Sequence, residues 1–73
     1  MFEILRVTVI FEGGTAVKYQ GDEVSYLMGT PTVSHVDTAR KIVWTRIKDL
    51  QEEPHNEALG EAKRIILAYR EKE

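Results

Sequence analysis

The chain has 73 residues, with ten basic and twelve acidic side chains, a formal net charge of -2 and no cysteine. A chain of this length forms one domain, near the size at which a single apolar core gives only marginal stability. The missing cysteines exclude disulfides and thiolate metal sites, and the small net charge gives no bulk attraction to nucleic acid or to anionic membrane.

We expect a cytoplasmic protein that forms a single small α+β domain over residues 1–73. The sequence contains no apolar run long enough to span a bilayer. It also shows no charged segment followed by an apolar signal region.

The segment from Phe2 to Glu12 is predicted to be a strand, but it is apolar on both faces. A half-buried strand alternates apolar with polar side chains. Here the odd and the even positions each carry an apolar stripe. The odd stripe consists of Leu5, Val7, Val9 and Phe11, and the even stripe of Phe2, Ile4 and Ile10. A chain this short offers little cover for the even stripe, which favours a second chain as its partner.

Gly13-Gly14-Thr15 predicts a hairpin into a second strand, Ala16–Gln20. A two-residue loop at Gly13-Gly14 places Ile10 opposite Val17. A three-residue loop places Phe11 opposite Val17 instead, and this one-residue slip exchanges the two faces. We favour the three-residue loop because it joins the odd stripe to the apolar face of the second strand.

Gly21-Asp22 predicts a second tight turn, followed by a third strand from Glu23 to Met28. In this strand Leu27 lies on the face opposite to Val24, Tyr26 and Met28. The segment 29–32 contains a proline, which lacks the N–H that a central strand needs, and is expected to end the sheet.

A first helix is predicted from an N-cap at Ser34, with Asp37 in its first turn, to about Leu50. Its buried stripe has helical spacing and consists of Val36, Ala39, Val43, Ile47 and Leu50. The sequence Glu52-Glu53-Pro54 interrupts this pattern.

A second helix is predicted from His55 or Asn56 to Tyr69 or Glu71, with Leu67 pointing away from its apolar face. That face consists of Ala58, Leu59, Ala62, Ile65, Ile66 and Tyr69. The predicted fold is therefore α+β, with a three-stranded antiparallel meander followed by two helices packed on one face of the sheet.

No motif for catalysis, a metal or a cofactor is recognisable. The two histidines, His35 and His55, begin different predicted helices, and a zinc site needs more converging ligands. Ser34, His35 and Asp37 are sequence neighbours, whereas catalytic triads are defined by converging side chains. The Glu52-Glu53 pair lies in an exposed break without an apolar pocket to raise a pKa. We expect a protein that is not an enzyme and has no metal or cofactor.

The second apolar face of the first strand predicts self-association. A contiguous apolar patch on a small domain usually marks an interface. A meander in sequence order also places the first strand at an edge of the sheet, and a long apolar edge strand is seldom left unprotected. The residues expected in a homodimer interface are Phe2, Ile4, Ile10, Leu27 and Leu67.

A ridge formed by Arg40, Trp44 and Lys48, with Lys41 beside it, is the second candidate surface. The spacing aligns the first three along one edge of the helix. An aromatic ring between cations can anchor an acidic protein partner or stack on a nucleobase, or it can simply close the edge of the core. The predicted function is a non-catalytic interaction module, namely a small adaptor, inhibitor or regulatory subunit. The alternative is a nucleic-acid-binding regulatory protein that uses this ridge.

Overall fold

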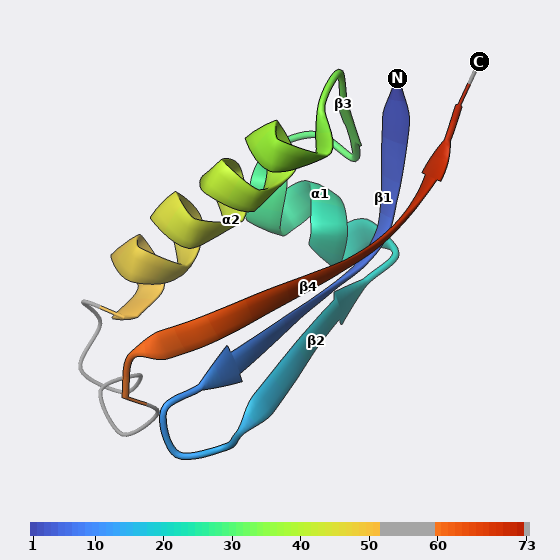
Figure 1. Ribbon diagram of the computed structural model, residues 1–73. Coiled ribbons are helices and arrows are strands. Elements are labelled where there is room, and N and C mark those ends of the chain that lie inside the picture. The colour runs from blue at the N-terminus through green and yellow to red at the C-terminus, as the bar shows by residue number, and fades with distance from the viewer. Residues whose placement is uncertain (52–59, 73) are drawn as a thin grey trace.

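A computed structural model describes residues 1–51 and 60–72 (Figure 1). Its elements, in chain order, are β1 (Phe2–Phe11), β2 (Ala16–Gln20), α1 (Asp22–Met28), β3 (Thr32–Val33), α2 (Val36–Gln51) and β4 (Ala62–Glu71). The predicted α+β class is confirmed, with an antiparallel sheet of four strands and two helices.

β1 lies at the centre of the sheet rather than at its edge. β2 pairs with the C-terminal half of β1, and β3 pairs with its first two residues. β4 pairs with β1 on the opposite side along almost its whole length (Figure 1). The prediction that β1 is an edge strand available to a second chain is wrong, because both of its sides are hydrogen-bonded within the monomer.

A β-bulge at Leu5 explains the unusual apolar pattern of β1. Ile4 pairs with Tyr69, whereas Arg6 pairs with the preceding residue of β4, so that Leu5 is an extra residue. One extra residue reverses the face that the following side chains occupy. Ile4 before the bulge and Val7 after it therefore enter the same core, with exposed fractions of 2% and 0%.

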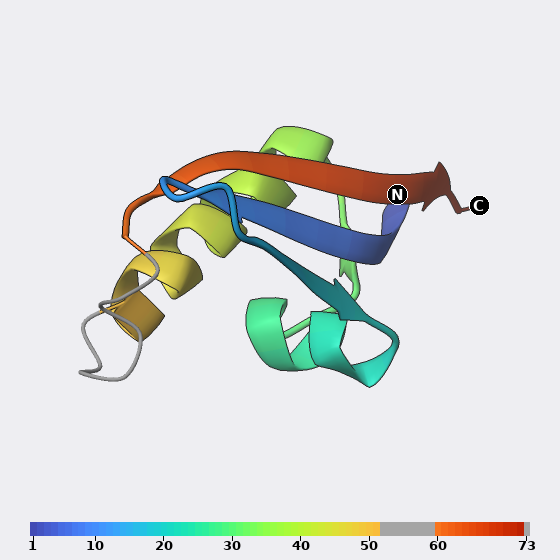
Figure 2. The ribbon, with the colours of Figure 1, turned by 90° about the horizontal axis from the view of Figure 1, so that it is seen from below.

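Both helices cover one face of the sheet, as the two perpendicular views agree (Figures 1 and 2). The buried core lies between this inner face and the helices. Its residues are Ile4, Val7, Val9, Phe11, Val24, Leu27, Met28, Val33, Ala39, Val43, Ile47, Ala62 and Ile65. Within the described residues, no helix or strand lies over the opposite, outer face.

The hairpin between β1 and β2 has a three-residue loop that begins one residue earlier than predicted. The Phe11 N–H donates to the Thr15 carbonyl, and the Gly14 N–H donates to the Phe11 carbonyl, each at 2.9 Å. Gly14 has a φ of 89°, which is the left-handed conformation that such loops require. Val17 lies opposite Val9 instead of Phe11. The odd side chains still face the core, because a two-residue offset preserves the faces.

The segment predicted as a third strand is helix α1. Its buried residues Val24, Leu27 and Met28 follow helical spacing, whereas Tyr26 is 68% exposed and does not share their face. Gly29 ends the helix with a φ of 82°, a left-handed C-cap. Alternating apolar residues fit a strand equally well, so the glycine was the signal that the sequence interpretation missed.

Pro31 does not end the sheet. Its carbonyl accepts a hydrogen bond from the Ile4 N–H at 2.8 Å, and Thr32 and Val33 pair with β1 as the short strand β3. The missing proline N–H is tolerated because β3 is only two residues long and lies at the edge of the sheet.

The first predicted helix is confirmed as α2. It begins one residue later than an N-cap at Ser34 implies, because the His35 carbonyl accepts the first bonds, from the N–H groups of Thr38 and Ala39. His35 is therefore the residue before the first helical turn, and Ser34 precedes it.

The second predicted helix is wrong over the residues that the structure describes. Ala62–Glu71 forms β4, which is antiparallel to β1. The spacing of Ala62, Ile65, Ile66 and Tyr69 fits a helix, but pairing along β1 outweighs this local preference. The Glu52-Glu53-Pro54 break and the predicted helix start at residues 55–59 lie outside the described residues.

The bulge yields a direct prediction. Ile4→Ala should lower the free energy of unfolding by about 2–4 kcal/mol because it leaves a cavity in the core. Ile10→Ala should cost about 1 kcal/mol or less because Ile10 lies on the outer face, only partly buried. Urea denaturation followed by circular dichroism measures both values. Equal losses would contradict the change of face at Leu5.

Candidate functional site

The five residues predicted for self-association do not form one exposed face. Ile4 and Leu27 belong to the core, and Phe2 and Leu67 are partly buried against it. Ile10 alone lies on the outer face of the sheet. The expected apolar patch is therefore wrong, because the bulge and helix α1 bury its central members. Self-association by another surface stays a prediction.

β4 has one side that no described strand pairs with. The Lys72 N–H donates a hydrogen bond to the Met1 carbonyl at 2.7 Å, which fixes the phase of the β1–β4 ladder from Lys72 back to Arg64. At the other end the Glu12 N–H donates to the Glu61 carbonyl at 2.8 Å, and a second register shift, with Lys63 as the extra residue, lies between the two bonds. Backbone groups of an antiparallel strand point alternately to its two sides. Between Arg64 and Lys72, the residues whose N–H and C=O point away from β1 are Ile65, Leu67, Tyr69 and Glu71.

Helix α2 lies along this open side of β4. The Arg40 guanidinium donates a hydrogen bond to the Ile65 carbonyl at 2.7 Å, which supports the outward direction of that group. Trp44, one turn further along α2, is 37% exposed. Its ring borders two hollows between α2 and β4, of about 430 and 370 Å³.

We call this surface the α2–β4 groove. It is lined by Arg40, Trp44, Thr45 and Lys48 of α2, by Glu61 just before β4, and by Ala62, Lys63, Arg64, Ile65, Ile66 and Leu67 of β4. The predicted ridge of Arg40, Trp44 and Lys48 is therefore brought together along one side of the groove. The β4 side could not be predicted, because that segment was assigned to a helix.

The groove carries an excess of positive charge although the whole chain is slightly acidic. Four of the lining residues are cations: Arg40, Lys48, Lys63 and Arg64. The acid among them, Glu61, forms an ion pair with Lys63 at 3.3 Å. The groove therefore combines outward backbone groups, an accessible aromatic ring and an electropositive lining.

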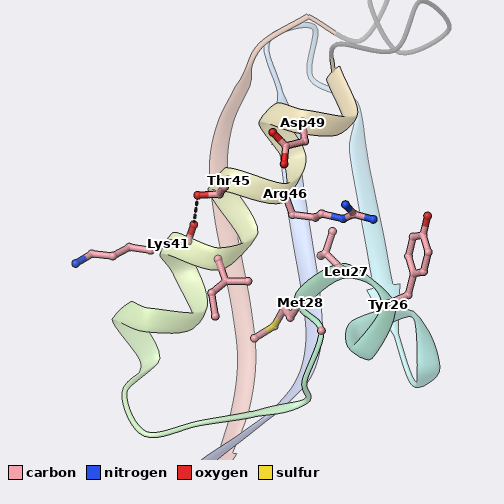
Figure 3. Close-up of a pocket in the computed structure, with 9 residues that line it drawn as sticks. Tyr26, Leu27, Met28, Lys41, Thr45, Arg46 and Asp49 are labelled. Atoms are coloured by element: carbon pink, nitrogen blue, oxygen red, sulfur yellow. Dashed lines mark hydrogen bonds between the residues drawn. The ribbon is translucent and has the colours of Figure 1, made fainter.

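Lys41, which was predicted to accompany the ridge, borders a different hollow. This hollow, of about 500 Å³, lies between α1 and α2 and has Leu27, Met28 and Ile42 among its lining residues. Lys41 extends away from it (Figure 3). Arg46 and Tyr26 also line this hollow, and the Arg46 guanidinium lies 5.5 Å from the centre of the Tyr26 ring.

Titratable groups give little further chemistry in the described part of the chain. No three His, Asp or Glu side chains there converge as a metal site. Burial raises the pKa of the Tyr19 hydroxyl, and the neighbouring Glu23 carboxylate raises it further. Tyr19 lies on β2, at the edge of the sheet opposite to the groove.

Comparison of the chain with protein-family models, curated proteins and solved structures finds no match. Among the described residues, neither helix has the length and apolar character needed to cross a membrane.

Arg40 provides a test of the contact between α2 and β4. Arg40→Met should lower the free energy of unfolding by about 1–2 kcal/mol, because it removes a charged donor from the Ile65 carbonyl. Lys41→Met, a change of similar size at an exposed neighbour, should cost about 0.5 kcal/mol or less. Urea titrations of both variants measure the difference, and equal stabilities would show that the Arg40 contact contributes nothing.

Proposed function

We propose that the protein is a non-catalytic interaction module that binds an extended, acidic segment of a partner protein in the α2–β4 groove. The observation that carries this proposal is the side of β4 that no described strand pairs with. Its outward backbone groups lie beside Trp44 and a row of cations. In this role the protein acts in the cytoplasm as a small adaptor, inhibitor or regulatory subunit.

Strand addition is the mode of binding that the groove favours. An extended peptide placed along β4 satisfies the outward N–H and C=O groups, and these backbone bonds supply affinity without a specific sequence. β4 is a ten-residue strand without proline, so its open side offers a long ladder. Natural proteins usually protect such an edge. Here Arg40 donates a side-chain hydrogen bond that protects the Ile65 carbonyl.

Side chains of the groove then give selectivity. Successive side chains of an added strand point alternately to the two faces of the sheet. One set would meet Trp44 and Lys48 on the helix side, where a partly exposed tryptophan is a favourable anchor. Acidic residues on the incoming strand would complement the surrounding cations, which speeds association and excludes basic segments.

A second copy of this chain is a less suitable occupant than an acidic segment. Pairing β4 with its two-fold mate would bring the two α2 helices together and place Arg40 and Lys48 of one copy near the same cations of the other. Like charges in close apposition cost free energy. An acidic segment is therefore preferred to a second copy of the chain as the occupant of the groove.

A peptide-capture experiment tests the proposal. The probe is a pool of ten-residue peptides with Glu at alternate positions and random apolar residues between them, offered to the immobilised protein. The control pool carries Lys in place of Glu. The acidic pool should be enriched, and enriched peptides should alter the emission of Trp44, which is the single tryptophan of the chain. Equal enrichment of both pools, or no change in emission, would contradict the proposal.

Leu67→Pro should abolish peptide binding while the protein stays folded. Proline removes the Leu67 N–H, which points away from β1, so the β1–β4 ladder keeps its bonds. Leu67→Ala is the matched control, because it loses the same side-chain packing but keeps the N–H. Titration of Trp44 emission with an enriched peptide compares the two. If Leu67→Pro, folded by circular dichroism, binds as well as Leu67→Ala, binding does not use the open side of β4.

A further inference from the structure

The outer face of the sheet is a second surface, on the side away from both helices (Figure 2). The pairing of the strands defines its residues, because side chains directly opposite each other share a face. Its cross-strand rows are Gln20, Arg6 and Ala68, then Lys18, Thr8 and Ile66, then Ala16, Ile10 and Arg64. Beyond the bulge, Glu3 and Arg70 form a further pair.

Cations dominate this outer face. Its basic residues are Arg6, Lys18, Arg64 and Arg70. The acid in these rows, Glu3, accepts a hydrogen bond from Arg70. Within the described part of the chain, the other three cations make no ion pair. The acidic residues of the helices, Asp22, Glu23, Asp37 and Asp49, belong to the opposite layer.

Three of these cations follow a diagonal across adjacent strands. Arg6 lies on central β1, Lys18 lies one row further along on β2, and Arg70 lies one row back on β4. Neighbouring strands are about 4.8 Å apart and alternate residues about 6.7 Å apart, so successive Cα atoms on this diagonal are roughly 8 Å apart. Long, exposed side chains at this spacing can follow a chain of anions.

We infer that the outer face binds the phosphate backbone of a single-stranded nucleic acid. The chain has a net charge of -2, yet basic side chains are concentrated on this face. Such a concentration indicates a surface that binds a polyanion. We expect a single strand rather than a duplex. In the described part of the chain, no helix projects from the outer face to enter the groove of a duplex. Ile10 and Ile66, between the cations, offer apolar contact to sugars and bases.

This surface is distinct from the protein-binding groove. Arg64 borders both surfaces, but Arg6 and Lys18 lie on β1 and β2, away from the open side of β4. The inference therefore does not depend on the proposed peptide binding. Leu67→Pro should remove peptide binding and leave nucleic-acid binding unchanged.

Fluorescence anisotropy with labelled 15-nucleotide oligo-dT and oligo-U tests the inference directly. Binding should be measurable at 50 mM salt and weaken at 200 mM. The slope of log affinity against log salt should be about -2, as expected for three neutralised phosphates on a single strand. A labelled duplex of the same length should bind more weakly. No change in anisotropy at 50 mM salt, or preferred binding of the duplex, would overturn the inference.

Two charge-reversal pairs locate the surface. Arg6→Glu with Lys18→Glu should weaken oligonucleotide binding about tenfold or more. Lys41→Glu with Lys48→Glu changes the net charge by the same amount on α2 and should weaken it far less. All four positions are exposed, so both variants should fold, which circular dichroism checks. Equal losses of oligonucleotide affinity in the two double variants would mean that binding depends on net charge alone. A loss confined to the second double variant would show that the helix ridge, and not the outer face, binds the oligonucleotide. Either result overturns the inference.

Discussion

The pairing of β1 on both of its sides is the constraint on which the rest of this structure depends. A central strand needs partners for two sets of backbone groups, and the chain supplies them from β2 and β3 on one side and from β4 on the other. The bulge at Leu5 allows apolar residues before and after it to enter one core. Without this change of face, a small chain with one layer of helices could not bury Ile4 together with Val7.

The sequence correctly predicted the elements whose apolar spacing fits only a helix or only a strand. β1, β2 and α2 have strong local signals, and the odd stripe of β1 does face the core. The segments 23–28 and 62–71 fit both a helix and a strand in their apolar spacing, and both were assigned to the wrong element. Pairing with distant β1 decides β4, and the left-handed conformation of Gly29 ends α1. Half of the groove, the ridge of Arg40, Trp44 and Lys48, was therefore predictable, and the strand beside it was not.

The proposed functions follow from what this topology leaves unpaired. Because β4 pairs with β1 on one side and with no other described strand, its other side is an edge, and α2 lies along it. Because both helices cover the inner face, the outer face is left with basic side chains and with the apolar Ile10 and Ile66 between them. An acidic segment in the groove and a nucleic-acid strand on the outer face would occupy different sides of the molecule.

The open side of β4 is the central claim, and amide hydrogen exchange measured by nuclear magnetic resonance tests it most directly. The N–H groups of Arg64, Ile66 and Ala68 point toward β1 and should exchange slowly. Those of Ile65, Leu67 and Tyr69 point away from β1 and should exchange much faster. This alternation along a single strand is the predicted result. Uniformly slow exchange along β4 in the protein without a ligand would contradict the account, because the edge would then already be paired.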